Sequence, residues 1–223
     1  NIEAIVGAGA DFVFAGWSYG FREGEVTPAA LREFGIQSYV LTESCVRKVA
    51  RTRVSLEDTF NDMLNLGRIF RIEPHAQALV EQQRAELQAV TDALKGIESR
   101  PKVFVYDGGT DNFTTSGRFG IPNAMIEAAG GRNIFDDIPS NWPRGNWEDV
   151  VERNPEWIVI IDYDHPGPQG KIDFLRSKPE LSEVEAIRRG SFVVLTYAEA
   201  TPGPGNVARV RTLAQAFHPG RVQ

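Results

Sequence analysis

Hydrogen-bond donors gather in the segment "TTSGRFG", residues 114–120, immediately before an apolar stretch that predicts a helix. Thr114, Thr115 and Ser116 offer hydroxyl groups, and Arg118 offers a guanidinium. The first turn of a helix has unpaired backbone N–H groups and a partial positive charge, so this segment suits an anionic or oxygen-rich ligand. A solvated loop that only caps the helix explains the same residues, and the segment alone does not decide between the two interpretations.

Aromatic and basic side chains also follow the predicted strands, in the loops "GWSYGFR", "DGGTDNF", "DYDHPGPQG" and "TYAEATPGPG" and in the loop "PSNWPRGNW". In open α/β sheets ligands bind beyond the carboxyl ends of the strands. Rings flanked by glycine favour a groove lining, although each could be a buried anchor, and arginines favour carboxylate, catecholate or phosphate groups. The predicted ligand-binding residues are Trp17, Tyr19, Arg22, Asp107, Gly109, Thr110, Phe113, Arg118, Trp142, Arg144, Trp147, Tyr163 and Tyr197.

The sequence patterns predict neither a catalytic residue nor a protein-held metal or cofactor. His75, His165 and His218 lack the spacing of a zinc site, and the chain has no nucleophile elbow, phosphate-binding P-loop or dinucleotide fingerprint in the right order. The segment "DYDH", residues 162–165, is compatible with a metal or acid–base cluster, but the Pro and Gly residues after it favour a solvated turn.

The composition is that of a globular protein, with 42% hydrophobic and 24% charged residues in a chain of 223. A net charge of −6 without any Lys or Arg run argues against nucleic-acid binding. The longest apolar runs, "WIVII" and "FVVL", are strand-sized and far shorter than the ~20 residues of a membrane helix. Cys45 is the single cysteine, so no internal disulfide can form.

The order of the predicted elements indicates an α/β fold with two Rossmann-like lobes and parallel sheets. Residues 1–73 form the remainder of a first lobe, 74–98 a single backbone helix of roughly 37 Å that joins the lobes, and 99–223 the second lobe. Ser55 and Asp58 form a capping-box pattern before a further helix. In the second lobe we expect strands at 102–107, 157–162 and 191–196 and helices at 147–153, near 171–188 and at about 205–217.

Three stretches resemble one known family. "NIEAIVGAGADFVFAGW", "FTTSGRFGIPNAMIEAAGGRNIFDD" and "WEDVVERNPEWIVIID" are similar, in this order, to segments of the substrate-binding proteins of ATP-binding-cassette (ABC) importers for ferric siderophores, haem and vitamin B12. These are class III periplasmic binding proteins, and the resemblance runs through essentially the whole chain. The family's first lobe begins with strand–helix material that is absent here, so we expect an N-terminally incomplete chain.

The resemblance implies two rigid lobes around a shallow inter-lobe cleft, an extracytoplasmic location and a permease–ATPase complex as partner. The protein would be periplasmic or tethered by a lipid anchor outside this segment. The expected cargo is a metal chelate such as a ferric siderophore, haem or a corrinoid, bound without catalysis. Two alternatives stay open: a receptor of the same fold for a metal-free anionic organic cofactor, and a chelatase or metallocluster-like enzyme that uses Asp107, Asp111 and His165.

The resemblance also implies one permease-docking glutamate in each lobe. The matching residues are Glu3 in "NIEAIV" and Glu148 in "NWEDVV", each near the start of a predicted helix. A carboxylate in the first turn is favoured by the helix dipole, so ordinary first-turn enrichment in acidic residues explains the same pattern. Asp149 is a competing candidate for the second position.

Overall fold

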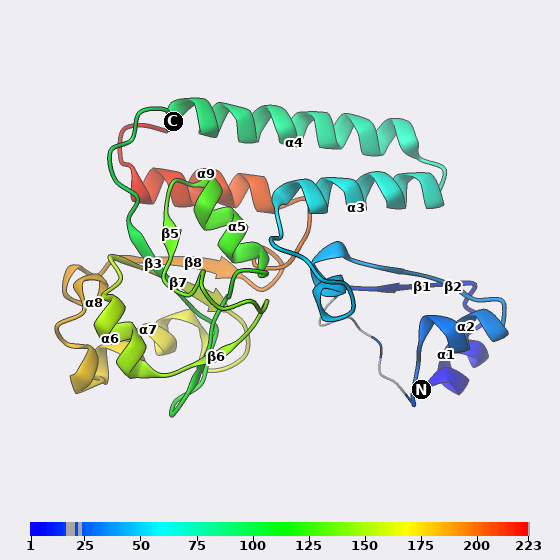
Figure 1. Cartoon of the computed structure of the whole chain (residues 1–223), viewed down its shortest axis with the longest axis horizontal. Coiled ribbons are helices and arrows are strands. Elements are labelled where there is room, and N and C mark those ends of the chain that lie inside the picture. Colours follow the sequence, from blue (N-terminus) through cyan, green and yellow to red (C-terminus); the bar gives the residue numbers. More distant parts are fainter. Residues whose placement is uncertain (17–20, 22–23, 223) are drawn as a thin grey trace. The chain divides into compact units, whose positions relative to one another are not determined.

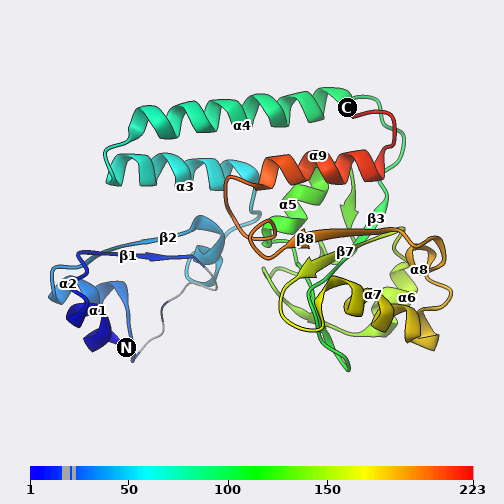
Figure 2. The same ribbon diagram turned by 180° about the vertical axis from the view of Figure 1, so that it is seen from behind.

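We describe the protein from a computed structural model, in which residues 1–16, 21 and 24–222 are placed. The chain divides into two units, Asn1–Arg51 and Thr52–Gln223, and each is described by itself (Figures 1 and 2). The boundary expected at residue 73 therefore differs from the observed division, because the helix after Ser55 belongs to the larger unit.

The smaller unit has an α/β arrangement. It contains α1 (Ile2–Gly7), β1 (Phe12–Ala15), α2 (Pro28–Glu33), β2 (Gln37–Val40) and the 3-10 helix η2 (Thr42–Arg47). Strands β1 and β2 pair in parallel, with Phe12 opposite Gln37. The side chains of Asn1 and Thr27 accept hydrogen bonds from the first turns of α1 and α2, as good N-cap residues do.

Two long antiparallel helices open the larger unit, α3 (Leu56–Ile69) and α4 (Glu73–Ala93). The predicted capping box is confirmed, since the backbone N–H of Ser55 donates to the Asp58 carboxylate at 2.8 Å. Helix α4 lies beside both α3 and the C-terminal helix α9 (Asn206–Phe217) (Figures 1 and 2). It ends at Ala93, five residues before the expected position 98. Leu94 caps the helix, and Gly96 adopts a φ of +75°.

A parallel sheet with the strand order β5-β3-β7-β8 forms the centre of the larger unit. Its strands are β3 (Lys102–Tyr106), β5 (Arg132–Asn133), β7 (Trp157–Asp162) and β8 (Phe192–Thr196). The chain adds β5 on one side of β3 and then crosses to add β7 on the other side. The α/β class with parallel sheets is thus confirmed, and the strand order places a topological switch point between β3 and β7.

Helices cover both faces of this sheet. Helices α5 (Ile121–Ala128) and α9 lie over one face, and α6 (Trp147–Arg153), α7 (Gly167–Ser177) and α8 (Glu185–Arg189) over the other, with the 3-10 helix η3 (Pro179–Leu181) between α7 and α8 (Figures 1 and 2). A short antiparallel ribbon of β4 (Phe113–Thr114) and β6 (Arg144–Gly145) lies outside the sheet. The core on the α6–α8 face contains Phe104, Phe113, Phe135, Trp147 and Leu175.

Candidate functional site

The loops after β3, β7 and β8 meet at one edge of the sheet, because parallel strands end at the same edge. We call residues 107–112, 163–166 and 197–205 the carboxyl edge. In doubly wound sheets the crevice outside the strand ends at the switch point is the usual ligand position. Here that crevice lies outside the ends of β3 and β7.

The loop after β3 is held in one shape by hydrogen bonds along its length. Thr114 donates its N–H to the carbonyl of Gly108 at 2.8 Å, and the Asp107 N–H donates to the carbonyl of Thr114 at 3.1 Å. The Tyr106 hydroxyl donates to the carbonyl of Gly109 at 2.9 Å. The Trp147 indole N–H donates to the carbonyl of Thr110 at 2.8 Å. The backbone of this loop is therefore preformed.

The β4–β6 ribbon brings more of the predicted residues to the same loop. Thr114 pairs with Arg144 in the ribbon, and Thr114 also bridges to Gly108, so Arg144 lies near the Asp107–Gly109 turn. Arg144 is exposed and Trp142, two residues earlier, is half-buried. The structure thus gathers Asp107, Gly109, Thr110 and Arg144 around one loop and ribbon, and Trp142 lies in the segment just before the ribbon strand β6.

Tyr163 and Tyr197 form an exposed aromatic pair on the neighbouring loops. Their ring centroids are 4.9 Å apart with an interplanar angle of 30°. Tyr163 is 51% and Tyr197 39% exposed, although both are large rings that could bury apolar surface. Exposed, closely spaced rings on fixed strand ends offer a flat apolar surface with polar hydroxyl tips, which suits a large planar or ring-shaped ligand.

The ammonium group of Lys171 links the loop after β3 to the loop after β7. Lys171 lies on α7, is only 2% exposed, and donates to the carbonyls of Ile161 and Tyr163, each at 2.7 Å. It also donates to the carbonyl of Asp107. The first two acceptors lie at the end of β7 and the third at the end of β3. One cation thus joins the two sides of the switch point.

Burial shifts the pKa values of Lys171 and of its neighbours Asp107 and Tyr106. Burial lowers the pKa of the Lys171 ammonium, and the carboxylates of Asp107, Asp162 and Asp164 oppose that shift. Burial likewise raises the pKa of the Asp107 carboxyl, with Lys171 acting in the opposite direction. Burial and then the charge of Asp107 raise the pKa of Tyr106 to about 12, so Tyr106 keeps the proton that it donates to Gly109.

Two predicted groove residues are core residues, which corrects the expectation. Phe113 is 0% and Trp147 5% exposed, and their rings lie 4.7 Å apart inside a cluster with Phe104 and Phe135. Their glycine neighbours suggested an open loop. Gly145 instead allows the Phe113 ring to lie against the paired strand β6, since a Cβ at Gly145 would lie 2.5 Å from that ring.

Arg118 does not join the carboxyl edge. Its guanidinium donates to the carbonyls of Asp136 at 2.8 Å and Asp137 at 3.3 Å. It lines a separate depression with, among others, Arg53, Arg132, Asp136 and Asp137. The hydroxyl-bearing residues Thr115 and Ser116 are fully buried, so this segment does not present the donors that its sequence suggested.

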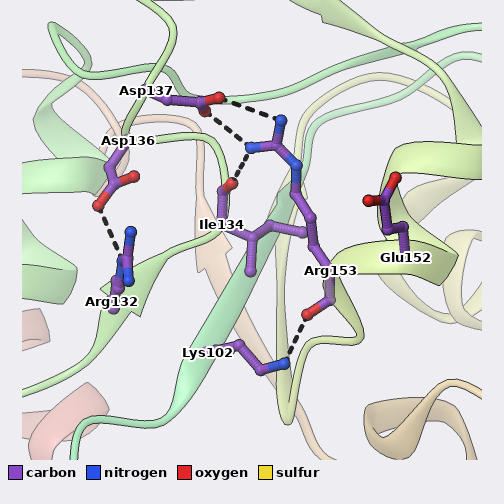
Figure 3. Close-up of a pocket in the computed structure, with 7 residues that line it drawn as sticks. All are labelled: Lys102, Arg132, Ile134, Asp136, Asp137, Glu152 and Arg153. Atoms are coloured by element: carbon purple, nitrogen blue, oxygen red, sulfur yellow. Dashed lines mark hydrogen bonds and ion pairs between the residues drawn. The ribbon is translucent and has the colours of Figure 1, made fainter.

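A pocket of about 420 Å³ lies at the opposite edge, where the strands begin (Figure 3). Arg153 makes a two-point ion pair with Asp137 at 2.7 and 3.1 Å, Lys102 donates to the carbonyl of Arg153 at 2.7 Å, and Arg132 pairs with Asp136 at 3.1 Å. Because both arginines are paired with carboxylates and Lys102 is bonded to a backbone carbonyl, we regard the pocket as a poor candidate for a ligand site.

Three predicted residues, Trp17, Tyr19 and Arg22, lie outside the described residues. Within the described part of the chain, no three His, Cys, Asp or Glu side chains are grouped so as to hold a metal ion. Lys171 was missed by the sequence reasoning, because a lysine in the helical segment "GPQGKIDFLRS" normally indicates a solvent-facing position.

Comparison with known proteins decides the family. The family model described as "Periplasmic binding protein" matches residues 2–198. The chain belongs to the periplasmic binding protein family. Within the described residues, no helix has both the length and the apolar character that a bilayer crossing requires.

Curated relatives of this periplasmic binding protein carry ligand names. It is 29% identical to the "Cobalamin-binding protein" of Halobacterium salinarum over 223 residues, which cover 98% of this chain and 56% of the relative. It is 29% identical to the "Vitamin B12-binding protein" of Yersinia pestis over 112 residues, 49% of this chain and 38% of that protein. The chain thus spans about half the length of the first relative and less of the second.

Solved structures share its fold. A periplasmic binding protein from Veillonella parvula superposes with a TM-score of 0.85 at 27% identity, covering 97% of this chain and 73% of the other. A periplasmic haem-binding protein from Roseiflexus sp. RS-1 gives a TM-score of 0.77 at 23% identity, covering 98% of this chain and 80% of the other. Both comparisons support the class III periplasmic-binding-protein fold.

Proposed function

We propose that this periplasmic binding protein is the substrate-binding component of an ABC importer and that it binds a metal chelate of the corrinoid, haem or ferric siderophore class. A cobalamin-type corrinoid is the first choice, since the cobalamin-binding protein of Halobacterium salinarum is similar over 98% of the chain. A ferric-hydroxamate transport protein and a haem-binding protein among the structural neighbours share the fold. The protein binds and releases its cargo without chemistry.

The observation that carries this proposal is the exposed Tyr163–Tyr197 pair at the ends of β7 and β8, next to the switch point. Two rings at 4.9 Å on rigid strand ends form a wall against which a macrocycle can pack. Asp107 is joined to Tyr163 through Lys171, and Thr110 and Arg144 lie on the same loop and ribbon as Asp107; we propose that these residues supply polar groups for peripheral amides or carboxylates. Recognition then rests on preformed surfaces, which reduces the entropy cost of binding.

Titration calorimetry with cyanocobalamin, haemin and a ferric hydroxamate tests this function. We expect one of the three to bind, with cyanocobalamin tightest, and we expect Tyr163→Ala combined with Tyr197→Ala to weaken binding by about 1–3 kcal/mol per ring lost. The melting temperature should change little because both rings are exposed. Phe70→Ala is the matched control, since Phe70 is a 57% exposed ring at the α3–α4 turn. No binding of any chelate, or equal losses in the control, would contradict the proposal.

Delivery to a permease is the second part of the proposed function. Glu3 and Glu148 are both exposed in the first turns of their helices, α1 and α6. Asp149, the competitor, accepts a hydrogen bond from the Asn146 side chain at 3.0 Å and so takes part in the helix cap. We assign the docking role to Glu3 and Glu148, which offer one negative point on each unit to arginines of a permease. An extracytoplasmic site of action follows from this role.

A further inference from the structure

We propose that Lys171 is a positioning residue that holds the carboxyl edge in its ligand-binding shape. The inference rests on the proposed function, because it concerns the same loops. Lys171 lies against the backbone of the loops after β3 and β7, and all three of its ammonium hydrogens have backbone carbonyl acceptors.

The acceptors show what the lysine fixes. The Asp107 carbonyl starts the loop after β3, and the Ile161 and Tyr163 carbonyls bracket the end of β7. Holding the carbonyl of Tyr163 restrains the backbone of the residue whose ring lies against Tyr197. Holding the carbonyl of Asp107 fixes the first residue of the loop that presents Gly109 and Thr110. A single group thus sets both halves of the proposed site.

An apolar residue would fill this position at a lower desolvation cost. A buried ammonium costs several kcal/mol in desolvation unless it is fully hydrogen-bonded. Leu175, one turn further along α7, is 0% exposed and packs in the core as an ordinary apolar side chain. The charge at position 171 therefore has a role other than packing. Its three acceptors lie at the ends of β3 and β7, so we place that role at the switch point.

The carboxylates around the ammonium complete the arrangement. Asp107, Asp162 and Asp164 all act on the Lys171 charge; Asp162 ends β7, and Asp107 and Asp164 lie on the two loops that the lysine joins. Lys171 therefore also attracts the carboxylates that lie at and just after the ends of β3 and β7. Without it, both the carbonyls and the carboxylates would favour a more open, hydrated pair of loops.

The first test compares Lys171→Met with Lys178→Met. Lys178 is a suitable control because it also lies on the α7 side of the core, over the Trp147 ring at 4.8 Å, but it pairs with Glu180 and not with the carboxyl edge. We expect Lys171→Met to weaken cyanocobalamin binding about tenfold or more at a temperature where both variants are folded, and Lys178→Met to leave it unchanged. Wild-type affinity in Lys171→Met would overturn the proposal.

Chemical rescue separates the charge from the packing. In a Cys45→Ser background, Lys171→Cys is alkylated in the unfolded state with 2-bromoethylamine, which restores an ammonium, or with 2-bromoethanol, which gives a neutral side chain of the same length. After refolding, the ammonium adduct should recover wild-type affinity and the neutral adduct should not. Equal affinity of the two adducts would show that Lys171 has only a packing role.

Hydrogen exchange gives a readout that does not depend on the ligand. Amides of residues 107–114 and 161–165 should exchange faster in the neutral adduct than in the ammonium adduct, while amides of α5 should not differ. This exchange pattern would support the positioning role even if no chelate binds. The absence of chelate binding would count against the proposed function and not against the positioning role. Equal exchange in both loops would overturn the positioning role whatever the ligand.

Discussion

Gly109 is the single residue on which the shape of the loop after β3 most depends. Its φ of +104° is a conformation that side chains disfavour, and a Cβ there would lie 2.2 Å from the backbone oxygen of Asn112. We predict that Gly109→Ala destabilises the protein by about 1–3 kcal/mol and weakens chelate binding, because the loop must open to admit the methyl group. Chemical denaturation and calorimetry measure the two effects.

Gly205→Ala is the control for that substitution. Gly205 caps α9 with a φ of −80°, and a Cβ there meets no atom within 4 Å. Because Gly205 belongs to the carboxyl edge, this variant controls for stability alone, and its unfolding free energy should stay within a few tenths of a kcal/mol of the wild-type value. If Gly109→Ala behaved like Gly205→Ala, the loop would not be a rigid part of the site.

At the same scale, the sequence predicted which residues lie at strand ends better than it predicted which loop residues are buried. Asp107, Tyr163 and Tyr197 follow strands with clear apolar patterns, so the rule for strand ends located them. Phe113 and Trp147 have the same kind of glycine-rich neighbourhood but turn into the core. Burial of a loop aromatic depends on tertiary packing, which local spacing does not encode. The same reason explains why buried Lys171 was missed.

At the scale of elements, the Arg153–Asp137 pair ties the end of α6 to the turn after β5. Arg153 contacts both carboxylate oxygens of Asp137 and the Ile134 carbonyl (Figure 3). Its guanidinium carbon also lies 4.7 Å from the centre of the Phe135 ring. The hydrogen bond from Arg153 holds the pKa of Asp137 below its ordinary value of 3.8. A lowered pKa contributes stability above the ordinary value, and this contribution is lost as the pH falls through the lowered pKa.

We therefore predict that Asp137→Asn lowers the unfolding free energy at pH 7 by only about 0.5 kcal/mol, because solvent screens a half-exposed pair. Below the lowered pKa, the variant and the wild type should be equally stable. Urea denaturation at pH 7 and at a pH below the lowered pKa measures this difference. A double-mutant cycle with Arg153→Gln gives the coupling energy between the two side chains. Additive effects of the two substitutions at pH 7 would show that the pair contributes no coupling.

Most elements of the larger unit were predictable from periodicity and caps. Helix α6 and strand β7 have the expected bounds, 147–153 and 157–162, because Asn146 caps the helix and five apolar residues define the strand. The β4–β6 ribbon was not predicted, since its two-residue strands pair across 30 residues of chain and leave no local pattern. This ribbon is what brings Arg144 to the site.

At the scale of the whole molecule, the permease-docking hypothesis predicts a split between binding and transport. Glu3→Lys combined with Glu148→Lys should leave chelate affinity nearly intact and abolish receptor-stimulated ATP hydrolysis by the reconstituted importer. Glu33→Lys combined with Glu152→Lys is the control, because both residues are exposed at the far ends of helices and outside the assigned positions. Full stimulation by the first double variant would remove the docking assignment.

Hydrogen–deuterium exchange of the wild-type protein with and without cyanocobalamin tests the central claim most directly. The account places the chelate at the carboxyl edge, so the amides of residues 107–112, 163–166 and 197–201 should become protected on binding. The charged pocket at the other edge, around Arg132, Asp137 and Arg153, should be unaffected. Protection confined to that pocket, or binding that leaves the carboxyl edge unchanged, would contradict the account.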